Sequence, residues 1–340
     1  ILIPQMAPIH FELLESAVRA SGYNAVLLRE CTQKTVETGL KYVNNDACYP
    51  SILTTGQFIE ALQSGKYDLD KTAIIMSQTG GGCRATNYIG FIRKALKDAG
   101  FEKVPIISFN VVGMEKMPGF KLTLPLLERL LKMVIYGDLL QKMLTKNRAY
   151  EINKGETEKL FNEWLEKCKK LVANSTKQFK QSIYNIVNDF EKIELDTSIE
   201  KPKVGVVGEV LIKYHPFGNN YVANVLEKEG AEVILPDFMG FVKFMATHKI
   251  TFNTLLKTTP TIAKISKAAI KLIDILEKDV KIALANSKKG YMQPCDIFHL
   301  EEQVKDVLSI GNQTGEGWFL TAEMIEYMEN GIPNIVCVQP

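Results

Sequence analysis

The chain has 340 residues, 46% of them hydrophobic, and its 41 basic and 39 acidic residues leave a formal net charge of +2. This near balance gives no electrostatic reason to expect nucleic acid or an anionic membrane surface as a partner, and no apolar run approaches the ~18 residues of a membrane span. No secretory signal is recognisable, and the six cysteines are widely scattered. We therefore expect a cytoplasmic, reducing setting rather than a disulfide framework.

Short β-rich runs alternate with helical periods along the first 120 residues. Apolar residues at helical spacing, closed by glycines, indicate helices between runs of branched residues. Alternation of strand and helix with short loops predicts a doubly wound, mostly parallel sheet. The expected order is strand 1–4, helix 10–20, strand 24–28, helix 52–63, strand 72–77, helix 87–99 and strand 104–109.

The pattern then becomes helical and later returns to alternation. Residues 122–144 and 156–190 indicate helices, and 192–203 indicates a polar linker. Alternation resumes with strand 203–209, helix 219–229, strand 231–236, a helical, lysine-rich stretch 238–289, a glycine-rich loop 311–317, helix 319–329 and strand 334–339.

These elements predict an α/β protein with two Rossmann-like lobes, each built on a parallel sheet. The first lobe is expected over 1–120 and the second over 201–340, with a helical connecting region over 121–200. The chain starts inside a strand-like run and stops just after another, so we expect it to be a piece of a longer polypeptide, truncated in its second lobe.

Cys48 lies in NNDACYPS (44–51), between a helix-start signal and a proline. With Asp46 or Ala47 as the cap, Pro50 falls in the first helical turn, where its missing N–H costs nothing. Cys48 would then lie at a helix N-terminus, whose free N–H groups and dipole stabilise a thiolate. A small buried apolar residue is the alternative interpretation.

Cys83 lies in SQTGGGCRATNY (77–88), a loop that follows a predicted strand. Its three glycines, Gly80, Gly81 and Gly82, permit positive φ and let backbone amides point at one anion, and Arg84 adds a fixed positive charge. Open α/β sheets bind their ligands at the carboxyl ends of strands. We therefore expect Cys48 and Cys83 to converge at one edge of the first sheet.

Two converging thiols are compatible with several chemistries. Zinc usually takes four ligands, often in tight pairs, and no such pair occurs in the sequence. A catalytic thiol needs a histidine base, and none of His10, His215, His248 and His299 lies in a recognisable motif. An iron–sulfur cluster and a phosphate held by the glycine loop remain as competing interpretations.

Four segments in order resemble the 2-hydroxyacyl-CoA dehydratase component family, which includes benzoyl-CoA reductase subunits and double-cubane cluster proteins. They are NNDACYPS, TGGGCRATNY, GEVLIKYHPFGNN (208–220) and GNQTGEGWFLTAEM (311–324). The resemblance extends from Ile1 to Pro340. It is closest to the C-terminal, dehydratase-like region of large CoA-substrate-specific enzyme activase fusions, where an ATP-binding activator module comes first.

The resemblance implies a cubane iron–sulfur cluster, a [4Fe-4S] cluster or a double cubane, held by three cysteines per subunit. Cys48 and Cys83 match the first two of them. The third would follow a Q-P-F-G-C pattern, and the sequence stops at Gln339–Pro340, immediately before it. With two of its three ligands, the site could lack a cluster. Cys337 lies inside the preceding predicted strand, and we do not assign it as a ligand.

The predicted function is an iron–sulfur electron-transfer module that receives low-potential electrons from an ATP-dependent activator on the same longer polypeptide. In the characterised relatives the reaction is reductive dehydration or ring reduction of CoA thioesters, and whether this chain is itself part of such an enzyme is left open. An acyl-CoA or other small-molecule substrate and a dimeric assembly are compatible with the resemblance. The alternatives are a non-catalytic scaffold without a cluster and an acyl-CoA-, nucleotide- or phosphate-binding module.

The second predicted lobe offers three further candidates. Glu209, Asn219 and Glu316 lie in loops at the carboxyl ends of predicted strands, so we expect them to line a cleft between the lobes. Their alternative role is to cap helices and form turns. Three of the other cysteines, Cys31, Cys168 and Cys295, are expected to be structural.

Overall fold

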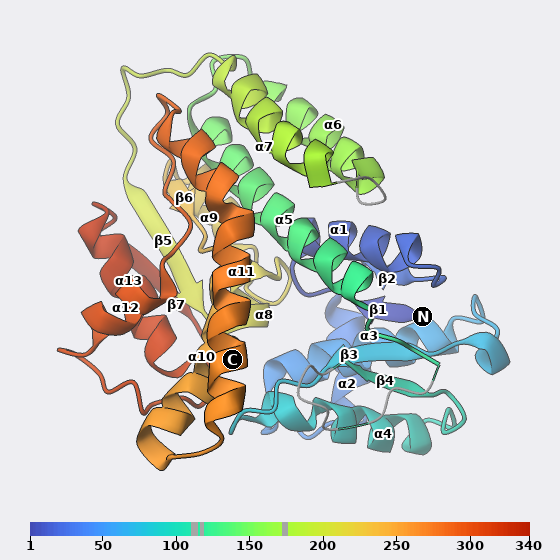
Figure 1. Cartoon of the computed structure of the whole chain (residues 1–340). Helices are drawn as coiled ribbons and strands as arrows, with labels where there is room; N and C mark the ends of the chain where they lie inside the picture. The colour runs from blue at the N-terminus through green and yellow to red at the C-terminus, as the bar shows by residue number, and fades with distance from the viewer. Residues whose placement is uncertain (110–114, 116–118, 172–175) are drawn as a thin grey trace.

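The computed structural model describes residues 1–109, 115, 119–171 and 176–340. It contains two sheets with parallel strands only, enclosed by helices, which confirms the predicted α/β class (Figure 1). In Figure 1 the first sheet lies beside the blue and cyan helices, and the second lies beside the red ones. The long helix α5 runs diagonally between these two parts.

The first sheet has the strand order β2-β1-β3-β4, in which β1 and β3 are central. Its central strands are buried and apolar, as strands covered on both faces by helices must be. The strands are β1 (Leu2–Pro4), β2 (Val26–Leu28), β3 (Ile74–Ser77) and β4 (Ile106–Phe109), and the helices are α1 (Pro8–Ala20), α2 (Gln33–Leu40), α3 (Tyr49–Gln63) and α4 (Tyr88–Asp98). The helix α2 was not predicted.

The second sheet has the order β6-β5-β7. Two elements depart from the prediction: a short helix α8 precedes α9, and the stretch 238–289 is split at Lys257, which takes a left-handed conformation with φ +53°. The strands are β5 (Lys203–Gly208), β6 (Glu232–Ile234) and β7 (Asn334–Val338), and the helices are α8 (Val210–Tyr214), α9 (Val222–Lys228), α10 (Phe238–Leu256), α11 (Pro260–Ala285), α12 (Ile297–Val304) and α13 (Gly317–Glu329).

Three helices connect the parts that carry the sheets, namely α5 (Leu124–Tyr150), α6 (Glu156–Leu171) and α7 (Thr176–Glu191). The predicted single stretch 156–190 is thus two helices, and residues 172–175 between them lie outside the described residues. The largest hydrophobic cluster joins α5, α6 and α7 with side chains from α1, α10 and α11. Helices from all three predicted regions therefore share one core.

The helices α2 and α3 cross with their backbones in contact. A Cβ at Gly39 would lie 2.1 Å from the carbonyl oxygen of Ile52, and a Cβ at Gly56 would lie 2.0 Å from that of Thr35. Each glycine thus admits the backbone of the other helix, which fixes α3 and the cysteine that precedes it. Among the described residues, no helix is both long and apolar enough to cross a membrane.

Candidate functional site

Cys48 is the N-cap residue of α3, so the helix begins one or two residues later than expected, and Pro50 lies in its first turn as predicted. The side chain is half-buried. Its Sγ accepts a hydrogen bond from the phenolic oxygen of Tyr88 over 3.0 Å. Tyr88 is the first residue of α4 and ends the second cysteine motif, so the two motifs are in direct contact.

The thiolate expected at Cys48 is not favoured in this structure. Burial raises the pKa of the Cys48 thiol, and the nearby groups Glu209 and Cys83 raise it further, against the hydrogen bond from Tyr88 and the charge of Arg84, which lower it. The Cys48 side chain accepts no capping hydrogen bond from the first turn of α3, and desolvation disfavours the charged form of a buried thiol. The protein without a bound group holds Cys48 as a neutral thiol.

The glycine loop is more compact than an open anion nest. Of its three glycines only Gly80 takes a positive φ, +75°, and Cys83 precedes a 3-10 turn, Arg84–Asn87, instead of α4 itself. Thr86 closes the loop by donating its hydroxyl to the carbonyl of Gly81 at 2.7 Å.

The glycine loop also meets two residues of the second predicted lobe. A Cβ at Gly82 would lie 3.2 Å from the hydroxyl of Thr314, and one at Gly81 would lie 3.8 Å from Cε1 of His248. Gly82 therefore serves close approach to the second predicted lobe rather than positive φ, whereas the distance at Gly81 is an ordinary van der Waals contact that a Cβ would tolerate.

Arg84 joins the two cysteine motifs, because its guanidinium donates to the backbone carbonyls of both Asp46 and Ala47. The sequence suggested Arg84 as a positive charge for a bound anion. In the structure its donors hold the segment that leads into Cys48. Arg84 is thus a structural link that sets the position of Cys48 against Cys83.

Glu209 and Glu316 converge on the N-terminus of α8. Glu209 accepts from the amides of Leu211 and Ile212 at 2.9 and 2.8 Å, and Glu316 accepts from the amide of Val210 at 2.7 Å. Burial, with the neighbouring Glu316, raises the pKa of Glu209 to about 7, and burial also raises the pKa of Glu316. The capping role foreseen as the alternative thus applies to both carboxylates.

The charge of Glu209 nevertheless acts on the thiol of Cys48 and on Tyr88. Cys48, which follows the first sheet's β2 and α2, therefore lies close to Glu209 of the second predicted lobe. The hydrophobic cluster of Leu53, Leu211 and Ile212 packs α3 against α8 just behind it. Asn219 does not join this group: its amide nitrogen donates to the carbonyl of Ile212 at 2.8 Å, in the turn before α9.

The sequence reasoning missed Tyr88, Thr314 and His248. Tyr88 and Thr314 lie inside the quoted motifs TGGGCRATNY and GNQTGEGWFLTAEM, so the motifs held a signal for both. His248 lies in a helix with no motif around it. It is 6% exposed, its Nε2 has no hydrogen-bond partner, and burial lowers its pKa to about 4, so the ring beside Gly81 is neutral.

A cubane cluster needs more ligands than this neighbourhood offers. Cysteine thiolates are the usual ligands of such clusters, and among the described residues no group of three or more His, Cys, Asp or Glu side chains is placed to hold a metal ion. Cys48 and Cys83 supply two thiols of the right chemistry. The described residues therefore fit part of a cluster site and do not complete one.

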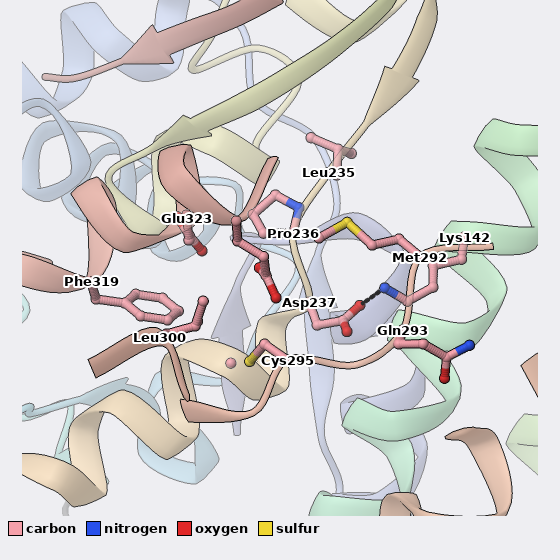
Figure 2. A pocket seen from close by; sticks show the side chains of 12 residues that line it. Lys142, Leu235, Pro236, Asp237, Met292, Gln293, Cys295, Leu300, Phe319 and Glu323 are labelled. Carbon is pink, nitrogen blue, oxygen red and sulfur yellow. Dashed lines mark ion pairs between the residues drawn. The ribbon is translucent and has the colours of Figure 1, made fainter. Parts of the chain in front are cut away.

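A second group of titratable side chains lies near Cys295, around a cavity of about 20 Å³ that is lined by residues 235–237, just after β6 (Figure 2). Lys142 and Asp237 form an ion pair of 2.5 Å at its wall, and burial raises the pKa of the Cys295 thiol well above its usual range. The cavity has room for a single water molecule. It is too small for a substrate, and a protonated thiol there is compatible with a structural role.

No family model, no curated protein and no solved structure matches this chain.

Proposed function

We propose that the chain is the cysteine-bearing part of an iron–sulfur electron-transfer module, with Cys48 and Cys83 as two of the cluster ligands. The module would belong to an ATP-driven reductive system like those of the 2-hydroxyacyl-CoA dehydratases and benzoyl-CoA reductases, in the reducing cytoplasm. An ATP-dependent activator on the same longer polypeptide would supply its electrons, and an acyl-CoA would be a typical substrate.

The observation that carries the proposal is the contact between the two cysteine motifs. Arg84, next to Cys83, binds the carbonyls just before Cys48, and Tyr88 binds the Cys48 sulfur itself. Motifs that start 33 residues apart are thus folded into one half-buried site. A cluster bound there would supply one-electron transfer, and its further ligands would come from outside the described residues.

The test is anaerobic reconstitution of the protein, at its full natural length, with iron and sulfide. We expect bound iron and sulfide, a brown colour and the paramagnetic resonance of a reduced cubane. Cys48→Ser and Cys83→Ser should each lose most of the iron, whereas Cys337→Ser, at an exposed thiol, should retain it. An iron-free wild-type protein, or full iron content in both Cys48→Ser and Cys83→Ser, would overturn the proposal.

A scaffold or ligand-binding module without a cluster is the second candidate, and the hydrogen bond that the half-buried Cys48 accepts from Tyr88 favours it. A thiol that is half-buried, protonated and hydrogen-bonded to Tyr88 is stable without a metal. In that case Cys48→Ser and Cys83→Ser should leave the activity of the full polypeptide unchanged. Measuring iron content and activity on the same variants separates the two functions.

A further inference from the structure

The helix α11 is apolar on two sides. Its inner side packs on α5, α7 and α10, where Ile270, Ile273 and Val280 are buried. In Figure 1 it is the orange helix at the front of the molecule. A second set of large apolar side chains, here called the α11 stripe, is 40–63% exposed: Ile262, Ile265, Leu272, Ile275 and Ile282. Surface helices normally turn polar residues to solvent, so this second apolar side indicates a binding partner.

The residues of the α11 stripe follow a seven-residue repeat. Ile265 and Leu272 occupy one position of a heptad, and Ile275 and Ile282 occupy another, three residues later. This is the a and d spacing with which one helix packs along another. From Ile265 to Ile282 the stripe is about 26 Å long at 1.5 Å per residue. The occupant that fits this spacing is a helix lying along α11.

The charges of α11 are divided between internal contacts and the surface. Its three carboxylates are all used within the chain. Asp274 and Glu277 accept from Lys243 at 2.8 and 2.5 Å, and Asp279 accepts from Tyr184 of α7 at 2.9 Å. The five lysines of the helix form no ion pair with any described residue: Lys264, Lys267, Lys271, Lys278 and Lys281. The surface of α11 thus carries cations without counter-charges.

Three of these lysines form a row beside the α11 stripe. Lys264, Lys271 and Lys278 are exposed and seven residues apart. Each directly precedes an a position of the heptad, so the three occupy g positions. In paired helices, g positions form ion pairs with the facing helix. A helix with glutamates or aspartates beside its own apolar stripe would therefore complement this face in both shape and charge.

Two other occupants fit the face less well. A second copy of this chain would bring the same lysine row and no free carboxylate on α11, and like charges placed across an interface suppress pairing. An anionic membrane is typically met by helices with Trp or Phe on the apolar side, whereas the α11 stripe contains only isoleucine and leucine. Charge and composition together favour a protein partner with an acidic surface.

We propose that the α11 stripe docks an amphipathic helix of a partner protein, whose apolar residues are flanked by glutamates or aspartates. Ile265 and Leu272 would pack between the apolar side chains of that helix, and Lys264 would pair with one of its carboxylates. This docking surface does not depend on a cluster at Cys48 and Cys83.

The test is binding of two fluorescent synthetic peptides to the protein, measured by anisotropy. Each peptide is about three heptads long with leucine at a and d. The acidic peptide has glutamate at e and g, and the basic peptide has lysine there. We expect saturable binding of the acidic peptide and binding of the basic peptide weaker by about tenfold or more. Binding should also weaken at about 1 M salt, where the screening length falls to about 3 Å.

Two multiple variants separate the apolar and the charged contributions. Ile265→Gln with Leu272→Gln removes two exposed apolar side chains and should weaken binding of the acidic peptide about tenfold or more, as the loss of central apolar contacts does. Lys264→Glu with Lys271→Glu and Lys278→Glu reverses the charge of the row. This triple variant should prefer the basic peptide to the acidic one. All five positions are exposed, so the changes spare the core.

The matched control is Leu124→Gln with Val307→Gln, which removes two exposed apolar side chains outside α11 and should bind like the wild type. No binding of the acidic peptide, equal binding of both peptides, or wild-type preference in the charge-reversed variant would overturn the proposal.

Two further measurements test the other occupants. Dimerisation in analytical ultracentrifugation that Leu272→Gln abolishes would overturn the proposal in favour of a second copy. Co-sedimentation with phosphatidylserine vesicles that Leu272→Gln abolishes, together with no binding of the acidic peptide, would overturn it in favour of a membrane surface.

Discussion

Tyr88 donates its phenolic hydrogen to the Sγ of Cys48 across 3.0 Å, so one cysteine motif contains the hydrogen-bond donor for the cysteine of the other. Tyr88 is 4% exposed and packs in the same cluster as β3 and α3. The contact therefore depends on the correct packing of α4 beside α3. It also means that the chemistry of Cys48 is controlled from the segment that holds Cys83.

Tyr88→Phe should make Cys48 less reactive. The hydrogen bond from Tyr88 lowers the pKa of the Cys48 thiol, whereas burial raises it. Removing the hydroxyl should therefore raise the pKa further and reduce the fraction of thiolate. We expect alkylation of Cys48 by iodoacetamide, followed by mass spectrometry at pH 8, to slow several-fold. Tyr67→Phe is the control, and equal rates in both variants would contradict the assigned hydrogen bond.

Arg84→Gln should loosen the segment before α3. The guanidinium donates to the carbonyls of Asp46 and Ala47, and the shorter glutamine amide cannot replace both bonds. We expect amide hydrogen exchange over residues 44–48 to become several-fold faster, with the rest of the chain unchanged. Arg93→Gln, which breaks an exposed pair with Glu115, should leave that segment protected. Unchanged exchange in Arg84→Gln would mean that the link does not hold the segment.

Glu209 should make the stability of the protein depend on pH between about 4.5 and 7. Its pKa is raised by burial to about 7 from 4.5, so the folded state binds the proton more tightly than the unfolded state. This contribution is fully present below pH 4.5 and is lost as the pH rises through 7. One such proton changes the free energy of unfolding by at most about 1.4 kcal/mol per pH unit.

Glu209→Gln should reduce the slope by this contribution, as measured by urea unfolding at several pH values. Glu277 and Glu326, whose pKa values burial raises to about 7 and about 8, add slopes of the same sign and remain in the variant. His215 and His248 contribute the opposite slope, because burial lowers both pKa values to about 4, so the informative quantity is the difference between variant and wild type. Glu102→Gln, at an exposed carboxylate, should keep the wild-type slope. If the pH dependence of the free energy of unfolding were the same in Glu209→Gln and in the wild type, the raised pKa of Glu209 would be contradicted.

The elements with strong local patterns were predictable from the sequence. The strand β3, the loop after it and the helix α4 follow from an apolar run, three glycines and helical spacing. The observed bounds of β3 and α4 lie within two residues of the predicted ones. The helix α8 was missed because its five residues, VLIKY, carry branched residues typical of a strand extension. The break at Lys257 has a local signal that the prediction missed, because Thr259 and Pro260 follow it as the N-cap and the first residue of α11.

The chemical state of the candidate site was harder to predict from the sequence than its location. The carboxyl-end rule brings Cys48 and Cys83 to one edge, but the state of the Cys48 thiol depends on burial against the hydrophobic cluster to which α4 contributes Tyr88. Burial between distant elements is a tertiary property, and it raises the pKa that the helix N-terminus was expected to lower.

Gly39→Ala and Gly56→Ala should each destabilise the protein severely. The new methyl group would lie about 2 Å from a backbone carbonyl of the facing helix, and overpacking of this kind costs ~1–3 kcal/mol or more. We expect a lower urea midpoint with an unchanged slope. Gly311→Ala is the control, because its Cβ would meet only a flexible Ser309 hydroxyl at 3.3 Å and a leucine methyl at 3.7 Å. Wild-type stability in Gly39→Ala would contradict the close crossing of α2 and α3.

Lys213→Met and Glu323→Gln should each cost more stability than any surface ion pair of this chain. Lys213 and Glu323 form two hydrogen bonds of 2.8 and 3.0 Å, with side chains 0% and 2% exposed, and they join α8 to α13. Removing one partner leaves the other charge buried and uncompensated, at a cost of ~3–5 kcal/mol. The free energy of unfolding of each variant in urea measures this cost.

A double variant separates the pair's net contribution from the penalty of an orphaned charge. Lys213→Met with Glu323→Leu removes both charges from the buried pair, so we expect it to recover much of the stability that either single change loses. Lys94→Met, at an exposed pair with Asp98, should cost at most ~1 kcal/mol. If the double variant were as unstable as the sum of the single ones, the two side chains would act independently, and the link between α8 and α13 would have to come from apolar packing alone.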